Sequence, residues 1–151
     1  MWRLSFEAAV GIQDPHPLAE QTEYFLQSVL PQNKVQLALS GQQLLGFIAA
    51  SSESVSQLYV RHDCQRRGIG SLLLQWAKQN SSGSLWLYTF KKNLVAQAFY
   101  ERHGFVAVQH GFEPIWQLED MKYFWSSAAK SAPQPFAGAG TSTGMAPQLN
   151  P

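Results

Sequence analysis

Two arginines and two glycines precede a strongly apolar segment in the stretch CQRRGIGSLLLQWAKQ, residues 64–79. Glycine at positions 68 and 70 lets a ligand approach the backbone closely, and Arg66 and Arg67 add positive charge beside it. If a helix begins here, its first N–H groups and its dipole also favour an anion. The residue types and their spacing therefore predict a turn that holds a phosphate or pyrophosphate group.

The turn matches neither of two common nucleotide-binding patterns. The spacing G-x-x-x-x-G-K-[ST] is absent, and so is the three-glycine dinucleotide pattern with an acidic residue about twenty positions later. Cations are nevertheless concentrated around the turn, because residues 58–103 contain seven of the eleven basic residues and two of the ten acidic ones. This imbalance favours a local anion site, with chance clustering on a solvated face as the alternative.

The elements that must position this turn follow from the pattern of apolar residues. Alternating or continuous apolar runs predict strands at residues 34–40, 44–50, 54–60, 85–90, 105–110 and 121–125. Helical spacing predicts helices around Leu4, Ala8 and Ile12, and over residues 18–30, 69–79 and 93–103. Strands that alternate with helices in the middle of the chain indicate a mixed α/β sheet of about six strands.

Three features mark where these helices begin, end and pack. The helix after the turn carries an apolar stripe at helical spacing, formed by Ile69, Leu72, Leu73, Trp76 and Ala77. Pro31 is expected to end the helix over residues 18–30, and Gly104 the helix over residues 93–103.

The character of the chain changes at Ser126. Residues 1–125 are expected to form one domain, with enough apolar residues to bury a core. In residues 126–151, nineteen of 26 positions are Pro, Gly, Ala, Ser or Thr, and Lys130 is the single charged residue. Such a composition predicts a flexible tail, with docking on the domain through Phe136 or Met145 as the alternative.

Several classes of protein are disfavoured by composition. No apolar run reaches about 18 residues, so we expect no membrane span, and the first residues do not resemble a signal peptide. A single cysteine, Cys64, excludes an internal disulfide and fits the reducing cytoplasm. Because that cysteine and four histidines are scattered along the chain, we expect no metal site.

A second motif lies in NLVAQAFYERHGF, which sets Asn93, Ala96, Tyr100 and Gly104 at fixed offsets. With Leu58-Tyr59-Val60 before the turn and Gln65-Arg66-Arg67-Gly68-Ile69-Gly70 within it, the chain resembles the GNAT (GCN5-related N-acetyltransferase) superfamily over residues 2–125. The resemblance implies an α+β fold, with a mixed, mostly antiparallel central sheet of about six strands flanked by about four helices. It also implies acetyl-CoA as co-substrate and no metal.

The resemblance assigns the acetyl-CoA site residue by residue. The turn is expected to bind the pyrophosphate, the strand 58–60 to pair with the pantetheine arm, and a backbone N–H of Tyr59 or Val60 to polarise the thioester carbonyl. Asn93 is expected either to bond the cofactor or only to cap its helix. The full expected set is Leu58, Tyr59, Val60, Gln65, Arg66, Arg67, Gly68, Ile69, Gly70, Ser71, Asn93, Phe99 and Arg102. Lys91 and Lys92 meet a phosphate or stay solvated, and are left out of this set.

In such an enzyme a primary amine attacks the thioester directly, so Cys64 is not expected to carry the acetyl group. Tyr100 is the expected general acid for the departing thiolate, with a role as a packed aromatic beside Phe99 as the alternative. No general base is predicted, because the strand position where many relatives have glutamate is Val55-Ser56-Gln57 here. Other candidates are a water chain and Glu53, Glu113, Glu119, Asp120, His16 and His110.

The predicted function is an acetyl-CoA-dependent N-acetyltransferase acting on an amine of a small molecule, peptide or protein. The alternative is a GNAT-fold module that binds CoA without catalysis. Nucleic acid is not an expected partner, because the arginines lie in a glycine turn and are not interleaved with aromatic residues. Acids in the regions expected to line the acceptor pocket hint at a cationic acceptor, namely Asp14, Glu20, Glu23, Glu113, Glu119 and Asp120.

The start of the chain departs from the family. GNAT proteins usually open with a strand, whereas the helical pattern here begins at Trp2, so that the strand is missing or the true start lies upstream. A sheet edge left uncovered in this way favours aggregation or a homodimer.

Overall fold

The computed structural model describes Glu7, Gly11, Gln13, Asp14, residues 16–127, Ala139–Thr141 and Leu149–Asn150. The expected first helix therefore lies outside the described residues, apart from Glu7 and Gly11, as do Phe136 and Met145. Within the described ranges no helix has both the length and the apolar content that spanning a membrane requires.

The first described helix runs further than its sequence predicts. It comprises α2 (Leu18–Tyr24), a π-helical turn (Phe25–Val29) and α3 (Leu30–Gln32), so the expectation that it ends before Pro31 is wrong by two residues. In the widened turn the N–H of Leu30 bonds the carbonyl of Phe25, five residues earlier. A shifted bonding pattern of this kind accommodates a proline that has no N–H to donate, and the backbone becomes extended at Asn33.

Six longer strands form the body of the molecule, and two short ones come from the tail. The bounds are β1 Lys34–Ser40, β2 Gln43–Ala50, β3 Val55–Val60, β4 Ser84–Phe90, β5 Val106–Glu113, β6 Leu118–Ser126, β7 Ala139–Thr141 and β8 Leu149–Asn150. All pairs among β1–β6 that form ladders are antiparallel, which confirms the predicted mixed, mostly antiparallel α+β fold. Strands β5 and β6 are longer than the strands predicted at residues 105–110 and 121–125, because the turn between them is shorter.

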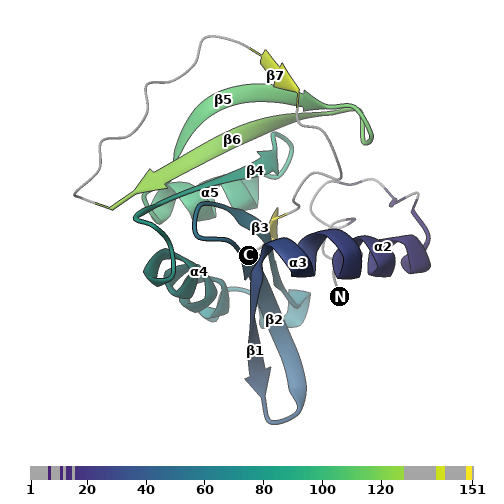
Figure 1. The fold of residues 1–151 in the computed structure, drawn as a ribbon, viewed down its shortest axis with the longest axis vertical. Helices are drawn as coiled ribbons and strands as arrows, with labels where there is room; N and C mark the ends of the chain where they lie inside the picture. Colours follow the sequence, from purple (N-terminus) through teal and green to yellow (C-terminus); the bar gives the residue numbers. More distant parts are fainter. Residues whose placement is uncertain are drawn as a thin grey trace.

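The strands form two four-stranded sheets, whereas the sequence predicted one. Their orders are β1-β2-β3-β8 and β4-β6-β5-β7. Figure 1 shows the β1–β2 and β5–β6 hairpins at opposite ends of the molecule. Backbone contact between β3 and β4 is limited to the start of the strands, where Ser54 and Trp86 form a parallel bridge and the N–H of Trp86 donates to the carbonyl of Glu53 at 3.0 Å.

Gly46 allows β2 to approach β3 closely at the end of β3. A Cβ atom on Gly46 would lie 2.5 Å from the carbonyl oxygen of Tyr59 and 3.2 Å from the Cα of Val60. Both are backbone atoms, so a side chain could be accommodated only by a backbone shift. The position of Tyr59 and Val60 therefore depends on glycine at residue 46.

Two helices follow the turn and the fourth strand. Helix α4 spans Ile69–Gln79, and α5 spans Leu94–Arg102. The predicted stripe on α4 is wrong in one respect, because Leu72 is 68% exposed, whereas Gly70, Leu73, Leu74 and Ala77 are buried. The three consecutive leucines at residues 72–74 allow two apolar stripes, one that includes Leu72 and one that includes Leu74. Because α4 packs against β2 and β3, the stripe with Leu74 is the buried one.

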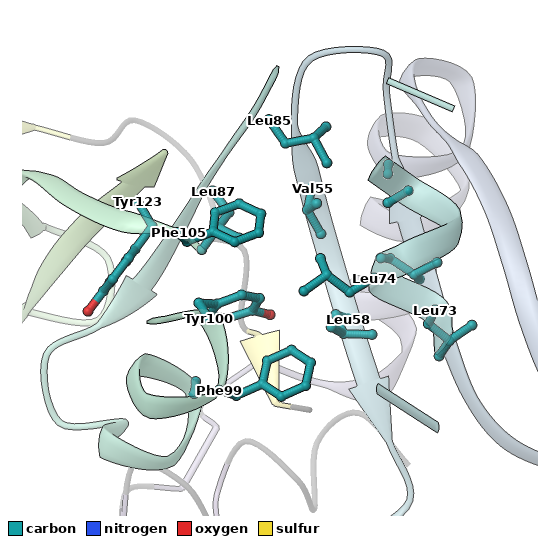
Figure 2. Packing of buried hydrophobic residues seen from close by; sticks show 14 residues of the cluster. Val55, Leu58, Leu73, Leu74, Leu85, Leu87, Phe99, Tyr100, Phe105 and Tyr123 are labelled. Atoms are coloured by element: carbon teal, nitrogen blue, oxygen red, sulfur yellow. The ribbon is translucent and has the colours of Figure 1, made fainter. Parts of the chain in front are cut away.

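The core lies between α4, α5 and the two sheets. Figure 2 shows Leu58 and Leu74 facing Tyr100 and Phe99 of α5, with Leu87 and Tyr123 of the second sheet beyond them. His103 caps the end of α5, and Gly104 has φ of 83°, the left-handed conformation that ends a helix. The expectation for the end of this helix is thus confirmed.

Two pieces of the tail pair with the domain. Strand β7 runs parallel to β5, with His110 opposite Ala139, and β8 runs parallel to β3. In the second pair Leu58 lies opposite Leu149, and Tyr59 opposite Asn150. Among the described residues no strand precedes β1, and β1 pairs with β2 alone.

Candidate functional site

A cleft of about 1290 Å³ lies between the turn before α4 and one face of α5. From the turn and its flanks it is lined by the predicted residues Val60, Gln65, Arg66, Gly68, Ile69, Gly70 and Ser71. From α5 and its start, the predicted residues Asn93, Phe99 and Arg102 line it. The structure therefore brings together most of the predicted acetyl-CoA set, although its two halves are more than twenty residues apart in sequence.

The start of α4 presents backbone N–H groups to this cleft. Gly68 is the N-cap, with φ of 81° and no side-chain cap, and the first helical bond runs from Leu72 N–H to Gly68 O at 3.0 Å. The N–H groups of residues 69–71 consequently have no partner within the helix. A Cβ atom on Gly68 would meet no protein atom within 4 Å, so the space beside these groups is open to a ligand. Such a helix start binds phosphate oxygens.

The side chains that line the cleft carry positive charge. Arg66, Lys92 and Arg102 line it, and no acidic side chain does. None of the three forms an ion pair with the part of the chain that the structure describes. By contrast, Arg61 is paired with Asp63, its Nη2 donating to Oδ2 at 2.9 Å. The cleft thus has cationic groups that no described carboxylate neutralises, as an anion site requires.

Arg66 has an unusual backbone conformation, with φ of 59°. A non-glycine residue in the left-handed region is uncommon, and here it turns the chain just before the helix starts. Arg67 is exposed and does not line the cleft, so of the two arginines predicted in the turn the structure brings one into it.

His103 is a residue of this cleft that the sequence reasoning missed. Its Nδ1 lies 2.7 Å from the carbonyl of Phe99, and its Nε2 lies 3.0 Å from the hydroxyl of Ser71. The ring therefore links the end of α5 to the first turn of α4 and fixes the distance between the two walls. Its position just before the helix-ending glycine gave no signal for such a contact.

Leu94, Val95, Ala98 and His62 were also missed, and the cleft is lined as well by Cys64 and Lys92, which the sequence analysis considered and left out of the set. Leu94 and Val95 are 71% and 57% exposed, although both are large and apolar. They share one face of α5 with Phe99 and Arg102, and this helical spacing was the available signal. An apolar wall beside a cationic turn fits a ligand with one charged and one uncharged part.

Asn93 caps its helix, which is one of the two roles that the sequence predicted for it. Its Oδ1 accepts the backbone N–H of Ala96 at 3.1 Å, as an N-cap side chain does. It is nevertheless one of the residues lining the cleft. Capping and contact with a ligand are therefore both available to it.

Leu58 and Tyr59 are fully buried in β3 and lie outside the cleft lining. The edge of β3 at these residues does not pair with β4, because the two strands separate after the bridge at Trp86. Strand β8 pairs with that edge instead. The edge of β3 thus accepts an extended chain in this structure.

Tyr100 is fully buried in the core. Its hydroxyl points from α5 towards β3, on the side of Leu58 (Figure 2), and has no hydrogen-bond partner among the described residues. Burial raises the pKa of this hydroxyl well above 10, so it is protonated at neutral pH. A protonated hydroxyl beside the separated strands can donate to a group that enters between them.

The candidate bases occupy different environments. Glu53, Glu119 and His110 are exposed, and Glu119 pairs with Lys91 at 3.3 Å. Glu113 and Asp120 are buried, at 0% and 1% exposed. Gln57, which belongs to the segment 55–57 considered for a base, is also buried and carries no charge at any pH. No group of three or more metal-ligating side chains occurs within the described ranges.

Comparison with protein families agrees with this geometry. A family model described as an acetyltransferase (GNAT) domain matches residues 31–107, which is more than half of the chain. The match includes all of β1–β4, the cationic turn and both helices that line the cleft. No curated protein matches the chain by sequence.

Solved structures share the fold. The ribosomal-protein-S18-alanine N-acetyltransferase from Escherichia coli is 18% identical, with a TM-score of 0.60 and coverage of 85% of this chain and 90% of that one. The apo form of YjaB from Escherichia coli is 19% identical, with a TM-score of 0.64 and coverage of 84% and 87%.

A third similar structure is that of a candidate streptothricin acetyltransferase from Bacillus anthracis in complex with acetyl coenzyme A. It is 23% identical, with a TM-score of 0.55, and the alignment covers 64% of this chain and 63% of that one. This chain therefore spans less than two thirds of the length of that protein. At such identities the likeness shows the fold.

Proposed function

Because the chain belongs to the GNAT family of acetyltransferases, we propose that it transfers the acetyl group of acetyl-CoA to a primary amine. The observation that carries the proposal is the cleft, which brings together uncapped N–H groups of α4, three cations that pair with no described carboxylate, and apolar residues of α5. A CoA molecule has the matching parts, namely a pyrophosphate and a long, mostly uncharged arm. The part played by acetyl-CoA is to supply an acetyl thioester as the acyl donor.

In this proposal the turn binds the pyrophosphate. The N–H groups of residues 69–71 and the guanidinium of Arg66 donate to its oxygens, and Arg102 and Lys92 lie at the same cleft. Of the remaining predicted residues of the turn, Gln65 shapes it, because its Nε2 donates to the carbonyl of Val60 at 3.3 Å, and Arg67 adds long-range charge.

The edge of β3 at residues 58–60 binds the pantetheine arm, as it would an added strand. A backbone N–H of Tyr59 or Val60 then donates to the thioester carbonyl and polarises it. Strand β8 pairs with this edge at Leu58 and Tyr59, so the tail and the arm compete for the same backbone groups.

Tyr100 is proposed as the general acid. Its hydroxyl is protonated, has no partner among the described residues, and points towards β3. The amine attacks the thioester directly, so no enzyme nucleophile is required, and the buried thiol of Cys64 has no part in the chemistry. We place the reaction in the cytoplasm, where a single free thiol stays reduced.

The experiment that tests the proposal is a thermal-shift titration of the full chain with acetyl-CoA, with ATP and NAD as controls. A ligand at 100 times its dissociation constant adds about 2.7 kcal/mol to the free energy of unfolding, which raises the melting temperature measurably. A shift with acetyl-CoA and not with the controls is expected. If a folded sample shows no such shift, the proposal is wrong.

Catalysis is distinguished from CoA binding alone by following free thiol release from acetyl-CoA with a panel of primary amines. An enzyme releases thiol in proportion to the amine present. A module that binds CoA without catalysis would show the thermal shift and no amine-dependent release.

A further inference from the structure

The side chain of His103 joins the two walls of the cleft. His103 is the C-cap of α5, Ser71 lies in the first turn of α4, and both line the cleft. The ring nitrogen Nδ1 of His103 lies 2.7 Å from the carbonyl oxygen of Phe99, and Nε2 lies 3.0 Å from Ser71 Oγ. One ring nitrogen therefore bonds the backbone, and the other bonds a hydroxyl beside the uncapped N–H groups of α4.

The contact with Phe99 decides which ring nitrogen carries a hydrogen. A carbonyl oxygen only accepts hydrogen bonds, so Nδ1 is the donor in this contact. In a neutral imidazole the other nitrogen, Nε2, then has no hydrogen and is an acceptor. Ser71 consequently donates its hydroxyl hydrogen to His103 as long as the ring is neutral.

That arrangement gives the Ser71 hydroxyl the wrong polarity for an anion. With its hydrogen directed at Nε2 of His103, the hydroxyl presents only lone pairs to a ligand in the cleft. When the ring is protonated, Nε2–H donates to Ser71 Oγ instead, and the hydroxyl hydrogen is released. The hydroxyl is then free to donate to a phosphate oxygen beside the N–H groups of residues 69–71.

Several contacts hold the His103 ring in this position. The ring lies 4.4 Å from the ring of Phe99 between centroids, at an angle of 42°. From α4, Lys78 Nζ donates to the carbonyl oxygen of His103 and lies over the Trp125 ring, 4.7 Å from its centroid. Because the ring and its backbone are both held, we expect protonation to reverse one hydrogen bond without moving the ring.

The charges around the ring couple its protonation to an anion. The acid nearest to it in sequence, Glu101, accepts the hydroxyl of Tyr123 and does not line the cleft. The other titratable or charged groups at the ring and the cleft are Lys78, Arg102, Arg66, Lys92, His62 and Cys64. Positive neighbours disfavour a further positive charge on the ring, whereas the phosphates of a bound ligand favour it.

We propose that His103 is a positioning residue that takes up a proton when the cleft binds a phosphate group and turns the Ser71 hydroxyl towards that phosphate. The inference rests on the proposed function, since it adds a proton-dependent pair to the pyrophosphate site. The proton comes from the solvent, and only hydrogen bonds are exchanged. Affinity for the ligand therefore increases as the pH falls through the range in which histidine gains its charge.

The test is calorimetric titration of dephospho-CoA into the full chain at pH 8, 7 and 6. This probe has the pyrophosphate of CoA but lacks the 3′-phosphate, so its phosphate charge is constant over this range. In His103→Asn the amide keeps a donor for the carbonyl of Phe99 and removes the titrating ring. His62→Asn is the matched control, because His62 lines the same cleft while the Ser71 hydroxyl is bonded to His103. Melting temperatures show that both variants are folded.

The wild type and His62→Asn are expected to bind the probe about tenfold more tightly at pH 6 than at pH 8, since one charge-assisted contact is gained. His103→Asn should bind equally at both pH values. At pH 7, titrations in two buffers of different ionisation enthalpy should show proton uptake by the wild type and none by His103→Asn. A merely structural role of His103 would instead weaken binding equally at every pH.

The proposal is overturned if the affinity of the wild type does not depend on pH, if His103→Asn keeps the dependence, or if His62→Asn loses it. Sulfate, a dianion at each of these pH values, is a second probe, read from the melting temperatures of the wild type and His103→Asn. If sulfate stabilises the wild type more than His103→Asn at pH 6 and neither CoA compound binds, the proposed function fails and the role of His103 stands. If sulfate stabilises both chains equally and neither CoA compound binds, both are wrong.

Discussion

The backbone N–H of Trp86 donates to the carbonyl of Glu53 at 3.0 Å, and beyond this bond β3 and β4 separate. The separation has two consequences. It leaves the edge of β3 at residues 58–60 available to an extended chain, and it lets the hydroxyl of Tyr100 approach that edge from α5. The end of the tail and the proposed pantetheine arm use the same opening.

Removal of residues 128–151 is therefore expected to strengthen acetyl-CoA binding. In the full chain β8 pairs with β3 at Leu58 and Tyr59, and a ligand that needs this edge must displace it. The apparent dissociation constant then equals the intrinsic one divided by the fraction of molecules with a free edge, so it is the larger of the two. Calorimetric titration of both chains with acetyl-CoA checks this, and equal or weaker binding by the shortened chain would contradict it.

Tyr100→Phe is expected to lower kcat about 100-fold, the usual size of a lost general acid, with little change in acetyl-CoA affinity. The variant should be at least as stable as the wild type, because the hydroxyl it removes is buried and unpartnered among the described residues. Steady-state kinetics and thermal unfolding measure the two effects.

Tyr123→Phe is the matched control for this variant. Tyr123 is buried in the same core, but its hydroxyl donates to Glu101 Oε1 at 2.9 Å. Loss of that bond should lower the free energy of unfolding by about 1 kcal/mol and leave kcat unchanged. An unchanged kcat in Tyr100→Phe would leave that tyrosine with only its packing role.

Arg66→Asn is expected to weaken acetyl-CoA binding about tenfold, because it removes a charge-assisted contact to the pyrophosphate. Asparagine tolerates the left-handed backbone that Arg66 adopts, with φ of 59°, so the turn should keep its shape. Arg61→Asn is the control, since Arg61 is paired with Asp63 and does not line the cleft. The difference between the two variants should shrink in 1 M salt, and equal affinities at low salt would exclude Arg66 from the site.

The buried carboxyl of Glu113 should make the free energy of unfolding depend on pH. Its pKa is raised by burial above the ordinary value of 4.5, so the folded state binds this proton more tightly than the unfolded state does. The resulting stabilisation is fully present below about pH 4.5 and is lost as the pH rises through the raised pKa. Urea unfolding from pH 4 to 8 should thus show the wild type losing stability relative to Glu113→Gln, and a gain with rising pH would contradict the sign.

The sequence predicted the elements well where one local signal dominated. Helix α4 and its cationic turn followed from the glycines and the apolar run, and β1–β4 were found within a residue or two. The phase of α4 was not predictable, because Leu72, Leu73 and Leu74 fit two stripes equally well, and only packing against β2 and β3 exposes Leu72.

The contacts between distant elements were beyond the sequence. Nothing local indicates that His103 reaches Ser71, that Gly46 must admit the carbonyl of Tyr59, or that the end of the tail lies along β3. Each of these is a contact between residues whose neighbourhood is created by the fold.

The sequence by itself determined the residue types of the turn that we propose binds the pyrophosphate, because glycine backbone freedom, arginine charge and a helix start all lie within ten consecutive residues. It also determined the α+β class, which rests on the period of the apolar pattern. The tertiary structure alone decided which charges remain unpaired and which carboxyl groups are buried. Charge pairing and burial depend on what other elements bring close, and for Glu113 those elements are the turn after β5 and the residues before α2.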